Sequence, residues 1–279
     1  MAEISASIVK ALREKTGAGM MECKKALVET SGDSVAAEKI LKERGLAAME
    51  KRADRITSEG RIFIKFAGGR AVIAELTCET DFVAKNADFI KVGEEICDKA
   101  LAKGYGEVNK DLSDMLIDLA SKIRENMTLR RIALTDIPTN AAASRYLHFD
   151  GKTGVITLIA CDPPSAASNP EVKAFAYDCC LHQAAFTPLY NTRKEVPESY
   201  IAEQKAIFDK QAAELDKPDK VKAGIAVGKL NKHLAEICFM DQLFVKDDKM
   251  SVAKKMEEVG KKAEAKLSLA GTVLWRLGM

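Results

Sequence analysis

A pattern of hairpin, helix, helix and strand occurs twice in this sequence, and this repetition limits the folds that the chain can adopt. In the first copy, alternating apolar residues over 61–78 surround a turn at Gly68-Gly69, which predicts a β-hairpin. Apolar residues then recur every three or four positions over 87–103 and 111–124, which predicts two amphipathic helices. A strand-like run over 128–134 closes the copy.

The second copy follows the same order. A hairpin is predicted over 146–161, around the polar turn 150–154. Asn169-Pro170 opens a helix, 251–265 has the pattern of another, and 271–277 is strand-like. We therefore predict an α+β fold with two similar subdomains, each a small antiparallel sheet with helices on one face.

An insertion interrupts the second copy between its two helices. It contains two charged helical runs, 200–215 and 219–237, separated by Asp216-Lys217-Pro218. A short connection between long charged helices predicts an antiparallel helical hairpin. Its apolar positions are too few for a core element, so it is either a solvated spacer or an arm for self-association or partner binding.

The N-terminal region is predicted to be a three-helix module with a thin core. Ser5 is a plausible cap of the first helix, 20–30 is the second, and 34–44 is the third, ended by Gly45. A dense run of charges then indicates a partly helical linker. The predicted domains are 1–45 for the module, 46–60 for the linker, 61–140 for the first subdomain, 141–196 with 240–279 for the second, and 197–239 for the inserted hairpin.

Charge and composition narrow the class of partner. With 43 basic and 41 acidic residues the formal net charge is +2, so no strong field favours nucleic acid or an anionic membrane. No apolar run approaches a membrane span, and the start lacks the features of a signal or transit peptide. The seven cysteines have no framework spacing, which favours reduced thiols. We expect a soluble, cytoplasmic protein.

Motifs for chemistry are weak. Gly151-Lys152-Thr153 resembles the end of a P-loop, but Tyr146 stands where that motif requires glycine. Cys179, Cys180 and His182 lack the spacing that zinc favours. None of the three histidines lies in a nucleophile motif. We therefore predict no catalytic residue, no metal, no cofactor and no enzymatic activity.

The junction after the strand 70–78 is the most specific stretch. Thr80 can cap a helix, and Asp81 suits the positive end of the helix dipole, so Phe82 should lie near the surface. A large aromatic residue there is either tucked under the loop or held outward as an anchor. The residues alone favour the tucked ring, because loop aromatics often close the edge of a core.

Two stretches resemble the signatures of bacterial elongation factor Ts, the guanine-nucleotide exchange factor for elongation factor Tu. One is Thr80-Asp81-Phe82-Val83-Ala84-Lys85-Asn86, and the other runs from Leu12 to Leu27. Lys217-Pro218 and Gln242-Leu243-Phe244-Val245 extend the similarity over nearly the whole chain. The resemblance favours an outward Phe82, and it implies that the N-terminal helices form a module like a ubiquitin-associated domain.

The resemblance also implies a set of partner-binding residues. Thr80, Asp81, Phe82 and Val83 would disturb the magnesium site of elongation factor Tu. Further contacts would come from Met20, Met21, Lys24, Met127 and His148. Each has a plainer interpretation: the methionine pair as core filler, Lys24 as part of a solvated face, Met127 as a turn plug, and His148 as a satisfied edge histidine.

The function implied is exchange: the protein would bind elongation factor Tu in its GDP form and promote GDP release. The alternative is a multidomain adaptor that binds partners without accelerating anything. Some members of the family dimerise through the helical hairpin, so a homodimer is a further expectation. Many relatives continue past the last strand into another helical module, whereas this sequence ends at Met279, so we expect that contact to be missing.

Overall fold

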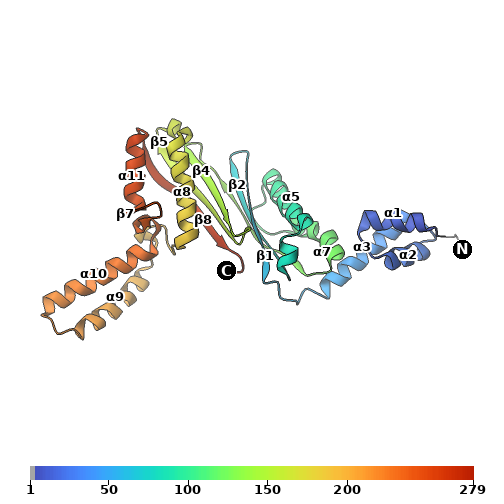
Figure 1. Cartoon of the computed structure of the whole chain (residues 1–279), viewed down its shortest axis with the longest axis horizontal. Coiled ribbons are helices and arrows are strands. Elements are labelled where there is room, and N and C mark those ends of the chain that lie inside the picture. Colours follow the sequence, from blue (N-terminus) through green and yellow to red (C-terminus); the bar gives the residue numbers. More distant parts are fainter. Residues whose placement is uncertain (1–3) are drawn as a thin grey trace. The chain divides into compact units, whose positions relative to one another are not determined.

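Two three-stranded sheets organise the computed structural model, which describes residues 4–279 (Figure 1). The chain divides into two units. The first comprises the described residues up to Asp136 with 147–154 and 275–279, and the second comprises 137–146 and 155–274. The small antiparallel sheets and the N-terminal helices confirm the predicted α+β class. The predicted domain boundaries stay a prediction.

The N-terminal module consists of α1 (Ala6–Thr16), α2 (Met20–Glu29) and α3 (Ser34–Glu50). The hydroxyl of Ser5 caps α1 by accepting from the amide of Ile8 at 3.4 Å. The small core of the module contains buried residues from all three helices, among them Val9, Leu12, Cys23, Ala26, Leu27, Ala37 and Leu41.

The expected end of the third helix at Gly45 is wrong, because α3 continues to Glu50. Gly45 lies against α7 (Ile117–Ile123), where a Cβ atom would come within 2.3 Å of the Ser121 hydroxyl. The glycine therefore permits a close approach of two helices rather than ending one. Tertiary packing overrides its weak helix propensity here.

The first sheet has the order β1-β2-β3, with β1 (Glu59–Ala67), β2 (Arg70–Cys78) and β3 (Met127–Asp136) all antiparallel. Ala67 pairs with Arg70, so Gly68-Gly69 is a two-residue turn. Both glycines have positive φ, at 57° and 71°, which this tight hairpin requires. The central strand β2 is buried along almost its whole length.

Helices cover this sheet. The predicted helix over 87–103 is confirmed as α5 (Ala87–Lys103), which packs on β1 and β2. The predicted helix over 111–124 is instead three pieces: α6 (Lys110–Ser113), the 3₁₀ turn η1 (Asp114–Leu116) and α7. Buried leucines lie before the 3₁₀ turn, at its end and after it: Leu112, Leu116 and Leu119. Because the apolar stripe is continuous, the periodicity did not reveal the break.

The second sheet has the order β4-β5-β8, with β4 (Ala141–His148), β5 (Thr153–Asp162) and β8 (Lys266–Arg276). Helix α8 (Pro170–Phe186) is capped by Asn169, and α11 (Val252–Lys262) follows a Ser251 cap. The hairpin followed by a late third strand repeats the first sheet, as predicted. Further short elements are η2 (Pro164–Ser168), η3 (Arg193–Glu195), η4 (Phe239–Asp241), β6 (Leu243–Phe244) and β7 (Asp247–Ser251).

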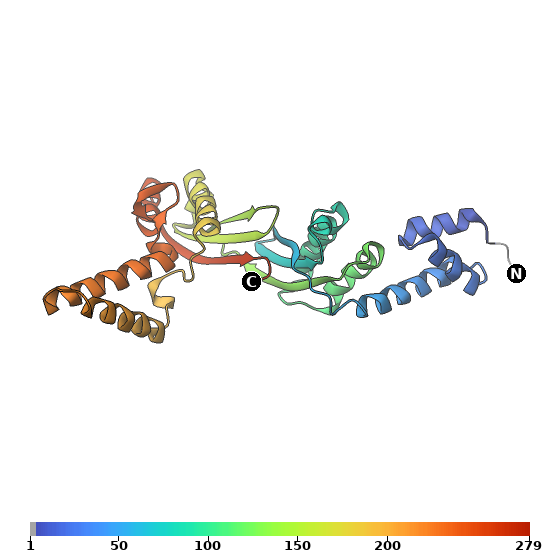
Figure 2. The ribbon, with the colours of Figure 1, turned by 60° about the horizontal axis from the view of Figure 1, so that its bottom comes forward.

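The inserted hairpin consists of α9 (Glu198–Ala213) and α10 (Asp219–Ile237), which Figure 2 shows as two antiparallel helices. Their buried residues are few: Ala212 on α9, and Ala226 and Leu234 on α10. In the part of the chain that the structure describes, no helix is long and apolar enough to cross a membrane.

Candidate protein-contact site

A four-residue helix, α4 (Asp81–Ala84), stands between the end of β2 and the start of α5. The hydroxyl of Thr80 caps it by accepting from the amide of Val83 at 3.4 Å, as the sequence predicts. Asn86 then caps α5 by accepting from the amide of Asp88 at 2.8 Å. Two successive caps therefore separate α4 from the longer helix α5 that follows it.

Phe82 points away from the core. Its side chain is 82% exposed, whereas Val83 and Ala84 beside it are buried, at 7% and 5%. The two small apolar residues belong to the core of the first sheet and fasten α4 to it. The tucked ring that the residues alone favoured is therefore wrong, because Val83 and Ala84 fill the space under the loop.

Glu125 holds the start of α4 in place. Its Oε2 accepts from the amides of Glu79 and Thr80 at 3.1 and 3.0 Å, and its Oε1 accepts from the Thr80 hydroxyl at 2.7 Å. Glu79 in turn accepts from the amide of Asn126 at 2.6 Å. Two loops distant in sequence are thus joined by charge-assisted hydrogen bonds. Sequence reasoning missed Glu125, since it lies in a turn without a motif.

Replacing Glu125 with alanine should lower the free energy of unfolding by about 1–3 kcal/mol, because two backbone donors and one hydroxyl lose their acceptor. Urea unfolding followed by circular dichroism measures the loss. Glu94→Ala is the matched control, because Glu94 is an exposed glutamate of the neighbouring helix α5. Equal stability of the two variants would contradict the role of Glu125 in holding the start of α4.

Asp81 carries a negative charge next to the exposed ring. Lys85 donates a hydrogen bond to its Oδ2 at 2.8 Å, one helical turn along. This hydrogen bond and the charge of the ammonium lower the pKa of Asp81 below its ordinary value, so the carboxylate is ionised at neutral pH. Both side chains of this pair are exposed to solvent. An aromatic ring and an anion therefore lie together on one anchored turn.

The other predicted residues lie elsewhere. Met20 and Met21 begin α2 and are 44% and 65% exposed, and Lys24 is exposed on the same helix. Met127 is 3% exposed in the core of the first sheet, which fits a turn plug. His148 ends β4, half-buried, with its ring centroid 3.8 Å from that of Phe149.

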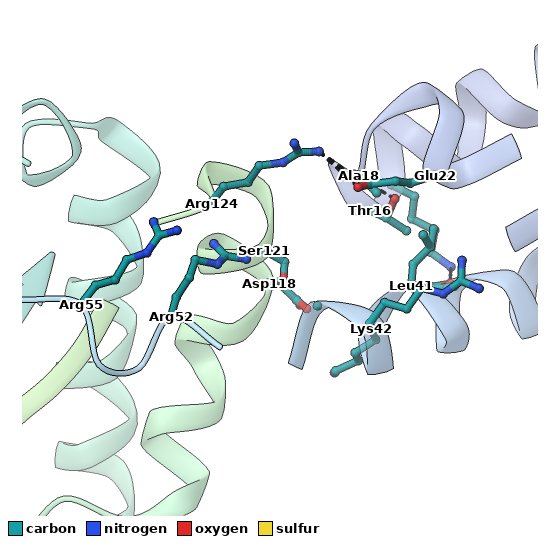
Figure 3. Close-up of a pocket in the computed structure, with 14 residues that line it drawn as sticks. Thr16, Ala18, Glu22, Leu41, Lys42, Arg52, Arg55, Asp118, Ser121 and Arg124 are labelled. Atoms are coloured by element: carbon teal, nitrogen blue, oxygen red, sulfur yellow. Dashed lines mark hydrogen bonds and ion pairs between the residues drawn. The ribbon is translucent and has the colours of Figure 1, made fainter. Parts of the chain in front are cut away.

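A hollow of about 460 Å³ lies between the N-terminal helices and α7 (Figure 3). Figure 3 shows Arg124 reaching toward Glu22, with which it pairs at 3.3 Å. Arg55 also lines the hollow and pairs with Glu79 at 3.3 Å. Because these arginines already have carboxylate partners, the hollow is best explained as the contact between the module and α7.

The described residues contain no group of three or more His, Cys, Asp or Glu side chains that could hold a metal ion. His182 is fully buried and uses both ring nitrogens: Nδ1 accepts from the amide of Val245 at 3.1 Å, and Nε2 lies 2.9 Å from Oε1 of Gln242. Burial lowers the pKa of His182, so the neutral ring with a proton on Nε2 satisfies both bonds. This histidine orders the segment before β7.

Comparison with known proteins agrees with these features. The family model described as Elongation factor TS matches residues 79–278. The chain is 58% identical to Elongation factor Ts of Treponema denticola, with 99% of both chains covered. It is 52% identical to Elongation factor Ts of Treponema pallidum over 99% of both chains, and 38% identical to that of Borreliella burgdorferi over 100% of both. The chain therefore belongs to the elongation factor Ts family of translation elongation factors.

Proposed function

We propose that this protein is a guanine-nucleotide exchange factor that binds elongation factor Tu in its GDP form and promotes release of the nucleotide. Membership of the family supports this proposal. The observation that carries it is the 82% exposed ring of Phe82 on a helix that the core and Glu125 hold in place. The chemistry changes no covalent bond, so no catalytic residue or cofactor is required.

Exchange requires differential affinity. The protein must bind nucleotide-free elongation factor Tu more tightly than the GDP-bound form. By linkage, GDP then weakens binding of the protein by the same factor by which the protein weakens binding of GDP. Release of GDP follows from this reciprocity without any input of chemical energy.

The magnesium ion at the phosphates of the nucleotide is the natural target. It neutralises phosphate charge and demands near-octahedral coordination, so small displacements of its ligands are costly. Phe82 inserts beside this site and shifts the groups that position the ion. The ionised carboxylate of Asp81 places a negative charge near the phosphates and repels them. Because α4 is held before binding, little ordering entropy is lost on docking.

The remaining predicted residues take different roles. Thr80 and Val83 support the helix that carries Phe82. Thr80 caps this helix, and Val83 anchors it in the core. Met20, Met21 and Lys24 are exposed, which supports a second contact through the N-terminal module. His148 makes a third contact with elongation factor Tu. Met127, at 3% exposure, acts from inside the sheet by supporting the turn.

Self-association through α9 and α10 stays a prediction, as do the absence of direct nucleic-acid contacts and the cytoplasmic location. Val221 and Val227 leave apolar side chains exposed on α10, at 45% and 52%. Light scattering on the purified chain separates monomer from dimer.

The test of the proposed function uses elongation factor Tu loaded with a fluorescent GDP analogue. Small amounts of this protein should accelerate loss of the label into excess unlabelled GDP, and added GDP should weaken the complex in return. An adaptor would bind without changing the rate of release. That outcome, or no binding at all, would contradict the proposal.

A further inference from the structure

The turn between β4 and β5 carries an exposed aromatic residue in an unusual backbone conformation. Phe149, Asp150 and Gly151 have φ values of 47°, 53° and 87°, so three successive residues lie in the left-handed region. Glycine adopts this region freely, but a bulky aromatic residue does so only under constraint. The Phe149 side chain is nevertheless 74% exposed, so burial of the ring does not explain its presence there.

Three contacts hold this turn against its neighbours in the first unit. The amide of Ile62 on β1 donates to the carbonyl of Gly151 at 2.7 Å, and the amide of Leu277 donates to the carbonyl of Lys152 at 2.9 Å. The ammonium of Lys152 donates to Glu59 at 2.9 Å. The turn is thus fixed on both sides, which allows it to retain the strained residue. Backbone strain of this kind concentrates at functional sites.

The turn and α4 line the same hollow, of about 200 Å³. Asp81 and Ala84 contribute from α4, Lys85 from the position after it, and Phe149 and Lys152 from the turn. The charges at the rim are largely compensated, since Lys85 pairs with Asp81 at 2.8 Å and Lys152 with Glu59 at 2.9 Å. Asp150 and Arg61 add one charge of each sign. The balanced charges leave little net field in the hollow, and Ala84 and Phe149 supply the apolar surface that an apolar side chain would contact.

We propose that Phe149 is a second aromatic contact residue and that this hollow receives an apolar side chain of the protein that Phe82 contacts. The occupant is elongation factor Tu, so the inference rests on the proposed function. The argument for this occupant is continuity: Asp81, the residue next to Phe82, lines the same hollow as Phe149. The sequence pattern drew attention to His148 but not to its neighbour.

Two substitutions at Phe149 separate contact from strain. Phe149→Ala removes the ring, and Phe149→Gly removes the ring and also relieves the left-handed backbone. Both should weaken binding to nucleotide-free elongation factor Tu about fivefold, which corresponds to about 1 kcal/mol of contact energy. The thermal midpoint of Phe149→Gly should be unchanged or raised. Phe186→Ala, which truncates another exposed phenylalanine at 52%, is the matched control and should bind normally.

Affinity is measured by isothermal titration calorimetry and is read separately from the rate of GDP release. If the wild-type chain binds elongation factor Tu without accelerating GDP release, the proposed function is wrong. The affinities of the Phe149 variants can still be compared with that of the wild-type chain. Unchanged affinity of Phe149→Gly, or no binding by the wild-type chain, would overturn the inference. A Phe149→Gly variant that loses self-association in light scattering while binding elongation factor Tu normally would assign the hollow to a second copy and would also overturn it.

Discussion

Replacing Phe82 with alanine is expected to reduce stimulated GDP release from elongation factor Tu at least tenfold without unfolding the protein. The ring is 82% exposed, so its removal leaves no cavity in the core. A central aromatic anchor typically contributes ~2 kcal/mol or more to an interface, and about 1.4 kcal/mol already corresponds to tenfold. The effect should therefore appear in the exchange rate and not in stability.

Stopped-flow fluorescence of a labelled GDP gives the rate, and circular dichroism confirms the fold. Phe186→Ala serves as the matched control, because it removes the same side chain at another exposed position. Its exchange rate should equal that of the wild-type chain. A Phe82→Ala variant with an unchanged rate would remove Phe82 from the mechanism, even if exchange itself were observed.

Replacing Glu75 with alanine is expected to destabilise the protein by ~3 kcal/mol, at the lower end of the range for breaking a buried ion pair. Glu75 is fully buried on the central strand β2. It accepts from Arg130 at 2.9 Å, from Arg131 at 2.5 Å and from the amide of Gly278 at 2.9 Å. The lower end applies because the arginine side chains remain 39% and 31% exposed and can regain water.

Urea unfolding measures this loss, and a double-mutant cycle with Arg131→Ala isolates the interaction. The second substitution should cost less in the Glu75→Ala background than in the wild-type chain. Arg131 also lies over the Trp275 ring at 4.2 Å, so a part of its contribution should persist without Glu75. A loss below about 1 kcal/mol for Glu75→Ala would show that the carboxylate is not the centre of this network.

Helices and turns whose ends are set by residues close by in the sequence could be predicted. Helix α5 begins and ends where predicted, because Asn86 caps one end and Gly104, with φ of 75°, closes the other. The two-residue hairpin turn at Gly68-Gly69 is equally local. The end of α3 could not be predicted, because Gly45 fits against Ser121, which is far away in the sequence.

The candidate site was predicted in part for the same reason. The Thr80 cap is a local signal, and the structure confirms it. The direction of the Phe82 ring depends on how Val83 and Ala84 fill the core. The hydrogen bonds that hold the start of α4 come from Glu125, which is 45 residues from Thr80. Phe149 lies in a left-handed turn that backbone hydrogen bonds join to β1 and to residue 277. Periodicity carries no information about such contacts.

The pairing of Glu75 with Gly278 joins residues 203 positions apart in the chain. A ribosome adds about 5–20 residues each second, so roughly 10–40 s separate the synthesis of these two residues. During that interval the carboxylate and its two arginines lack one of their partners. Folding of the first unit is therefore completed only after the segment 275–279 has left the exit tunnel.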